Sequence, residues 1–274
     1  MAITLTQQEK LILKQVALPP RPQALLDFAA ETKQPEPDIS KIAKILQSDG
    51  AISAAVLQVV NSAAFRRNRE IDAIDQAIMM LGLKRIIPLV KAVALKSSVK
   101  TSAALATFWD DQTKIAECCA QLALRLNKPG LSNYAYMLGL FHFAGVPILY
   151  QHFKDYDCVF EFAEQNGWDK ANVFQSQQYN TCHATIGALL AQQWGLPKAM
   201  IYAIYYQHDM EDLYSSGELD EVGLDLLSIL KIARSACYGD KYQQDWLVAT
   251  DQICDHFNLS DDEVTELIQD IMLA

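Results

Sequence analysis

Apolar residues recur at helical spacing along nearly the whole chain, and no segment shows the strict alternation that is typical of a half-buried strand. Glycine and proline are sparse, with 11 and 9 among 274 residues, so the segments between turn signals are long. Hydrophobic residues make up 51% of the chain, which is enough to bury a large core. The sequence therefore predicts an all-α fold.

Turn and capping signals divide this pattern into helices. The segment LPPRP at 18–22 interrupts it, because proline lacks an amide proton and fixes φ. Asp49 is expected to cap a helix over about 50–64, and Gly82 is expected to end one over 72–81. Ser260 and Glu263 have capping-box spacing at the start of the last helix. Further helices are predicted over about 6–17, 22–33, 39–46, 83–99, 105–126, 132–143, 146–165, 169–178, 182–194, 197–207, 222–238 and 243–256.

Charge is unevenly distributed along the chain. The net charge of −10 disfavours a general nucleic-acid-binding role, because neutralising phosphates requires a basic face. Residues 66–100 hold eight Lys and Arg against three Asp and Glu, whereas 205–274 hold sixteen acidic residues against three basic ones. Both segments are typical of solvated helical faces. Alternatively, the two segments attract each other, or each recruits an oppositely charged partner.

Three features bear on the compartment. The six cysteines form no C-x-x-C pair, so neither a disulfide framework nor a zinc knuckle is expected. The N-terminal MAITLTQQEK lacks the apolar core of a signal peptide, and we expect reduced thiols in the cytoplasm. The segment 129–153 has no Asp, Glu, Lys or Arg, but its polar residues, proline and glycines favour a buried core helix over a membrane span.

Four segments carry a resemblance to a known family: LPPRPQALLDFA, ILQSDGAISAAVLQVVNSAAF and AIMMLGLKRIIPLV in the N-terminal part, and HATIGALLAQQWGLPKAMIYAIYYQHD in the C-terminal part. They resemble HDOD domains, which are helical bacterial signalling modules related to HD-type metal phosphohydrolases. The resemblance covers about residues 12–240, and its most specific motifs are Asp49 with NSAAF at 61–65, Leu81-Gly82, His183 with Gly187, and WGLP at 194–197. It implies a two-lobed helical bundle with a regulatory or scaffolding role. We expect an N-terminal lobe over 1–104 and a degenerate HD-like lobe over 105–274.

The same resemblance implies a metal site that has lost its ligands. Active HD-type enzymes have a His, then a His-Asp pair, then a distant Asp. Here these positions fall near Asp111, at His142-Phe143 and near Arg234. A benzyl ring cannot bind a cation, and a guanidinium brings a fixed positive charge. Divalent metals need several converging anionic or imidazole ligands, so no metal, no cofactor and no catalytic residue is expected.

Two further histidines leave an alternative open. His183 and His208 lie in segments whose family counterparts carry histidines, and Asp209 follows His208. A rescued metal site from His142, His183, His208 and Asp209 is conceivable. The favoured interpretation is that His142 and His183 are core histidines bonded to backbone carbonyls, and that His208-Asp209 caps a helix end.

Asn61 and Ser62 interrupt an otherwise apolar run. Buried polar groups need hydrogen-bond partners, so we interpret them as fixing a contact between helices or between lobes rather than as ligand-binding groups.

The sequence thus predicts a non-catalytic regulatory module of a bacterial signalling pathway. It would bind a protein partner through a degenerate HD-type cleft and charged faces, with neither nucleic acid nor membrane as a partner. One alternative is a residual phosphohydrolase that uses Asp111 together with the histidines and Asp209. The other is a sensor that binds a nucleotide messenger without cleaving it, near Arg66, Arg67, Arg69 or Arg234.

Overall fold

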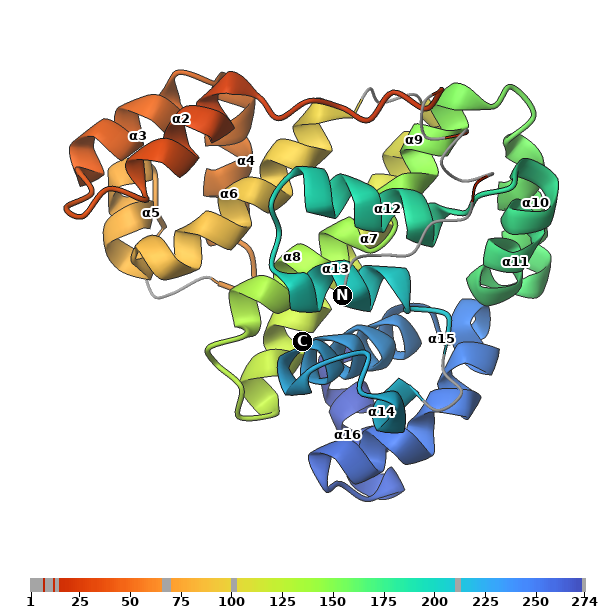
Figure 1. Cartoon of the computed structure of the whole chain (residues 1–274). Helices are drawn as coiled ribbons and strands as arrows, with labels where there is room; N and C mark the ends of the chain where they lie inside the picture. The colour runs from red at the N-terminus through yellow and green to blue at the C-terminus, as the bar shows by residue number, and fades with distance from the viewer. Residues whose placement is uncertain are drawn as a thin grey trace.

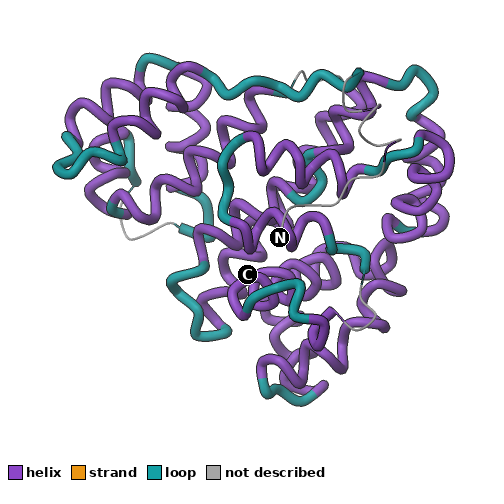
Figure 2. Tube along the Cα trace, viewed as in Figure 1, coloured by secondary structure: helices purple, strands orange, loops and turns teal. Residues whose placement is uncertain are grey.

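The computed structural model describes residues 15–65, 70–99, 103–209 and 213–272, together with positions 7 and 12 (Figure 1). Within these ranges, only the backbone is described for 103–104 and 240–245. Every regular element in the described part is an α-helix, which confirms the all-α prediction (Figure 2). Most of the helix predicted over 6–17 lies outside the described residues, as do Arg66, Arg67 and Arg69.

Four short helices pack together at the N-terminal end of the described chain (Figure 1). Asp49 caps the third of them by accepting hydrogen bonds of 3.1 Å from the amides of Ala51 and Ile52. Gly82 ends the fourth with a φ of +74°, where a side chain would be strained. Both local signals were correctly predicted. The helices are α2 (Gln23–Glu31), α3 (Ile39–Gln47), α4 (Gly50–Val60) and α5 (Ile74–Leu81).

A central group of three helices surrounds the most buried segment of the chain: α6 (Leu83–Ser98), α7 (Ala103–Arg125) and α8 (Ser132–Phe141). Nine of the ten residues of α8 are buried, which explains the lack of charge in this segment and confirms the predicted core helix. α7 passes so close that a Cβ atom on Gly139 would lie 2.5 Å from the Ala116 Cα. None of the described helices is both long enough and apolar enough to cross a bilayer.

The remaining helices cover the C-terminal half: α9 (Gly145–His152), α10 (Asp157–Asn166), α11 (Trp168–Tyr179), α12 (His183–Gln193), α13 (Lys198–Tyr205), α14 (Leu213–Ser216), α15 (Glu221–Phe257) and α16 (Asp261–Met272). The single helix predicted over 146–165 is wrong, because the chain breaks between α9 and α10. The Phe153 ring stacks on Tyr179 there with centroids 4.2 Å apart, and Tyr156 is fully buried. Tyr179, which contacts both Phe153 and Tyr156, belongs to α11, so no signal in the sequence near residue 153 marks the break.

The long helix α15 folds back on itself. A straight helix rises about 1.5 Å per residue and would separate Asp225 from His256 by about 46 Å. Instead, the His256 Nε2 lies 2.9 Å from the Asp225 Oδ1. The two helices predicted over 222–238 and 243–256 therefore correspond to the two arms of α15, although helical turns continue between them.

Local caps and ion pairs fix the acidic C-terminal region. The capping box predicted for α16 is present: the Ser260 amide donates to Glu263 Oε2 at 2.8 Å, and the Glu263 amide donates to Ser260 Oγ at 3.3 Å. Arg125 pairs with Asp270 at 2.6 Å, and Lys128 pairs with Asp225 at 2.8 Å. Within the described part of the chain, these cations come from α7 and the loop after it, not from the basic segment 66–100.

Two hydrogen bonds join the two predicted lobes, one of them through the N-terminal segment before α2. The Trp194 indole donates to the carbonyl of Pro19 at 3.1 Å, and the Lys91 ammonium donates to the carbonyl of Gly195 at 2.9 Å. Buried side chains from Val16 to Ile271 form one continuous core. The boundary between residues 104 and 105 stays a prediction.

Asn61 fixes the segment that leads from α4 to α5. Its side-chain amide donates to the carbonyls of Leu57 at 3.0 Å and Ile71 at 2.7 Å, and its carbonyl accepts from the Ile71 amide at 2.9 Å. The residue is half-buried. The Asn61 side chain therefore satisfies both the amide and the carbonyl of Ile71, and a leucine side chain could form neither hydrogen bond.

We predict that Asn61→Leu lowers the free energy of unfolding by about 1–3 kcal/mol, because it leaves two backbone groups of Ile71 without partners. Urea denaturation followed by circular dichroism measures this. The matched control is Gln58→Leu, an exposed position on the same helix, which should change stability by no more than about 0.5 kcal/mol. Equal effects of the two substitutions would contradict the role assigned to Asn61.

Candidate functional site: a buried histidine cluster

Three histidines from separate segments surround the ring of Phe143. His142 and Phe143 follow α8, His183 begins α12, and His208 follows α13. The centroid of the Phe143 ring lies 4.3 Å from that of His142, 4.7 Å from that of His183 and 6.1 Å from that of His208. The fold thus brings together four of the residues that the sequence singled out, and we refer to these four as the histidine cluster.

Two glycines allow the helices of the cluster to approach. A Cβ atom on Gly145, at the start of α9, would collide with the carbonyl oxygen of His183. A Cβ atom on Gly187, one turn into α12, would lie 3.4 Å from the Gly145 nitrogen. The lack of side chains at this crossing sets the position of His183 relative to the turn that carries His142 and Phe143.

His142 is a core histidine, as predicted. Its side chain is fully buried, and its Nδ1 lies 2.6 Å from the carbonyl oxygen of Gly139. Because a carbonyl only accepts, Nδ1 carries the proton and Nε2 keeps its lone pair. This Nε2 is buried and has no hydrogen-bond partner among the described residues.

His183 is bonded differently from the prediction, because its partners are side chains rather than a backbone carbonyl. Its Nδ1 lies 3.0 Å from the Gln175 Nε2, and its Nε2 lies 3.0 Å from the Nε2 of His208. The Gln175 carbonyl accepts from the Tyr156 hydroxyl at 3.0 Å and from the His183 amide at 2.8 Å. This pattern assigns the His183 proton to Nε2, which donates to His208.

The sequence analysis missed Gln175 and Tyr156. Gln175 is fully buried but belongs to a polar run, QSQQY, in which nothing local distinguishes it from its exposed neighbours. Tyr156 falls in the break that was predicted to be helical. Their roles depend on how α10 and α11 fold against α12, which periodicity does not report.

Arg234, on α15, lies beside the histidine cluster. It is fully buried, and its Cζ lies 4.9 Å from the centroid of the Phe143 ring, so the guanidinium faces the electron-rich side of that ring. It also donates to the side-chain carbonyl of Gln207, whose amide donates to the backbone carbonyl of His142 at 2.7 Å. The nucleotide-sensor alternative included Arg234, but a residue buried in this way does not face an incoming ligand.

The two predicted aspartates lie apart from this arrangement. Asp111 accepts a hydrogen bond of 2.5 Å from the Tyr238 hydroxyl, at the contact of α7 with α15. Asp209 is exposed, and its amide donates to the carbonyl of Tyr206. The prediction that His208-Asp209 caps a helix end is wrong, because Tyr206 is the C-cap of α13 and the His208 ring contacts His183 instead.

The side chains present do not fit a divalent metal. His183 and His208 share a hydrogen bond through their Nε2 atoms, and Phe143 and Arg234 occupy the space beside them. In the part of the chain that the structure describes, no three His, Cys, Asp or Glu side chains converge as a ligand set.

The electrostatics keep the three histidines neutral. Burial lowers the pKa of His142 and of His183 well below its usual value, and the nearby Arg234 lowers both further. Burial also lowers the pKa of His208, with smaller contributions from His183, Arg234 and Lys231. Protonation of any of these histidines would place a second positive charge near the Arg234 guanidinium, which cannot deprotonate.

These lowered pKa values predict that stability falls in mild acid. Above pH 6.5 both the folded and the unfolded protein hold neutral histidines. Below pH 6.5 the histidines of the unfolded state bind protons, whereas those of the folded cluster stay neutral. Each histidine therefore lowers the free energy of unfolding by up to about 1.4 kcal/mol per pH unit. His208→Gln, which keeps an acceptor for His183, should reduce this slope by up to about one histidine's contribution. Urea denaturation between pH 7.5 and 5.5 measures it, and an unchanged slope would contradict the assignment.

The fold and the cluster together define an HD-like helical protein in which three histidines surround a phenylalanine ring beside a buried guanidinium. The HDOD domain profile matches residues 18–210, which is more than half of the chain. The chain belongs to the HDOD family.

Solved structures show the same fold. One provisionally named a phosphohydrolase, from Shewanella amazonensis SB2B, is 24% identical with a TM-score of 0.69, covering 95% of this chain and 92% of that chain. An HDOD domain protein of unknown function from Geobacter sulfurreducens is 21% identical with a TM-score of 0.67, covering 97% and 95%. One provisionally named a signal transduction protein, from Marinobacter aquaeolei VT8, is 20% identical with a TM-score of 0.68, covering 100% and 60%.

A curated relative extends well beyond this chain. It is an uncharacterised protein of Treponema pallidum, 24% identical over 194 residues. The match covers 70% of this chain and 38% of the relative.

Proposed function

We propose that this protein is a non-catalytic regulatory module that binds a protein partner in a bacterial signalling pathway. The observation that carries the proposal is the contact between two fully buried side chains: Phe143, which the three histidines surround, and Arg234 beside it. The HDOD family and the name of the Marinobacter structure support the signalling role.

The pair argues against metal-dependent chemistry on physical grounds. A divalent cation about 5 Å from the Arg234 guanidinium would be repelled by roughly 7 kcal/mol at an effective dielectric constant of about 20. Phe143 offers no lone pair in compensation. A metal would therefore have to displace both side chains from a packed interior, in which Phe143 also contacts Trp168 with centroids 4.7 Å apart.

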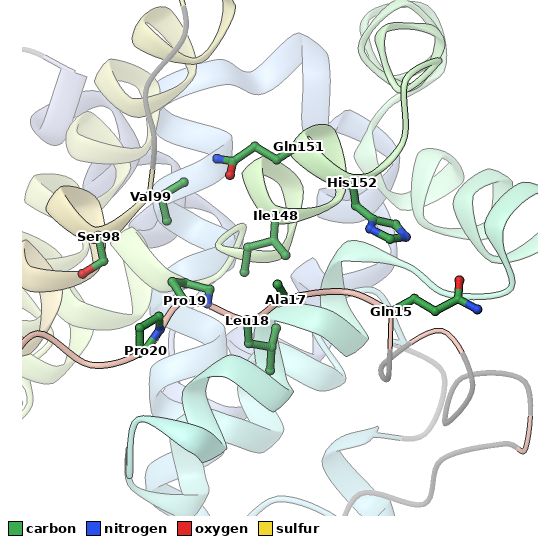
Figure 3. Close-up of a pocket in the computed structure, with 10 residues that line it drawn as sticks. All are labelled: Gln15, Ala17, Leu18, Pro19, Pro20, Ser98, Val99, Ile148, Gln151 and His152. Carbon is green, nitrogen blue, oxygen red and sulfur yellow. The ribbon is translucent and has the colours of Figure 1, made fainter.

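Two surfaces suit a protein partner. One is a pocket of about 340 Å³ where the N-terminal segment passes α9, with Leu18, Pro19 and Ile148 forming its apolar lining and His152 at its edge (Figure 3). This pocket lies where the two predicted lobes meet. The other is α16, whose exposed acidic side chains would attract a partner with a basic surface: Asp261, Asp262 and Glu266.

Elemental analysis tests the non-catalytic part of the proposal. We predict that protein purified without chelator carries far less than one iron, manganese or zinc per chain, and that it hydrolyses a phosphodiester only at the background rate. The double variant Phe143→Asp/Arg234→Asp should bind Mn²⁺ more than about tenfold more tightly than the wild type, because it replaces a ring and a cation with two anionic ligands.

The matched control is Phe143→Asn/Arg234→Asn, which changes size in the same way but adds no negative charge. It should not gain comparable Mn²⁺ affinity. A stoichiometric metal in the wild-type protein, together with a hydrolysis that His142→Ala abolishes, would overturn the proposal in favour of a residual phosphohydrolase.

A further inference from the structure

Two cysteines that are 119 positions apart in the sequence lie in contact. The Sγ atoms of Cys118, on α7, and Cys237, on α15, are 3.0 Å apart. Both thiols are free, and both side chains are half-buried. A disulfide bond needs a sulfur separation of about 2.0 Å, so bond formation requires a movement of only about 1 Å.

The pair is open to small reagents. It lines a pocket of about 380 Å³, together with Lys114, Glu117, Gln121 and Met272. Cys119 is the next residue on α7 but is fully buried. The two neighbouring cysteines thus differ in access, which makes one a candidate for oxidation and the other a natural control.

The two thiols also differ in acidity. Donation from the Cys237 thiol lowers the pKa of Cys118, whereas the same contact and burial raise the pKa of Cys237. Burial raises the pKa of Cys119 well above its usual value. Because the thiolate is the reactive form, Cys118 is the better nucleophile of the three.

We propose that Cys118 and Cys237 form a reversible disulfide when the protein meets a hydroperoxide. The Cys118 thiolate attacks the terminal peroxide oxygen, which forms a sulfenic acid and releases water or an alcohol. The Cys237 thiol then attacks the sulfenic sulfur and releases water. Two thiols and one hydrogen peroxide thus give one disulfide and two waters: the sulfur atoms lose two electrons, and the peroxide gains them. A dithiol reductant returns the disulfide to two thiols and is itself oxidised to a disulfide.

The bond would fix the α7–α15 contact beside the histidine cluster. Arg234 lies three residues before Cys237 on α15, and Tyr238, the next residue, donates to Asp111 of α7. The oxidised protein would therefore hold the Arg234 segment covalently against α7. This modification goes beyond the proposed function and does not depend on it, since it requires neither a partner nor a metal.

The test uses the full chain in native buffer. Reduced protein is treated with hydrogen peroxide, quenched with iodoacetamide and digested with trypsin, which joins peptides 115–125 and 235–241 if the bond forms. We expect the linked peptide in the wild type and in Cys119→Ala, and its loss in Cys118→Ala and Cys237→Ala. The urea midpoint of the oxidised wild type should rise and return when dithiothreitol is added.

Three outcomes would overturn the inference. One is stepwise oxidation of Cys118 to sulfinic and sulfonic acid with no linked peptide. Another is a linked peptide that survives in Cys118→Ala but disappears in Cys119→Ala. The third is a link that forms only in urea, which would mean that the folded thiols cannot meet. Circular dichroism of each variant confirms that the alanine substitutions leave the fold intact.

Discussion

The contact between the Arg234 guanidinium and the Phe143 ring is the interaction on which the centre of the molecule depends. A fully buried cation is costly unless it is compensated, and here the ring face and the Gln207 side chain contribute to the compensation. The same Gln207 amide binds the carbonyl of His142, and His142 in turn binds the carbonyl of Gly139. The turn after α8, the end of α13 and the middle of α15 are therefore held as one unit.

The resemblance drawn from the sequence implies that this unit corresponds to the metal site of HD-type enzymes. A metal keeps its histidine ligands neutral and oriented. In this chain, Arg234 and burial keep His142 and His183 neutral, and hydrogen bonds to Gly139 and Gln175 orient their rings. A guanidinium cannot dissociate into solvent as a metal ion can. The protein thus keeps a positive charge in its interior without depending on an exchangeable ion.

The sequence predicted what is encoded locally. The cap at Asp49, the glycine at 82 and the capping box at Ser260 depend on adjacent residues, and all three are present. The resemblance located Phe143 and Arg234, but their contact depends on a turn and a helix that meet only in the fold. The break before α10, the partner of His183 and the pair of thiols were missed for the same reason, since each joins segments that are distant in the chain.

Helix α15 connects these features. Its first arm carries Lys231, Arg234 and Cys237, and its second arm returns so that His256 meets Asp225. A displacement of this helix along α7 would move the guanidinium away from the Phe143 ring and from Gln207, two contacts that stabilise its buried charge. The α7–α15 contact is consequently the place where a partner or a covalent bond outside the cluster would have its largest effect inside it.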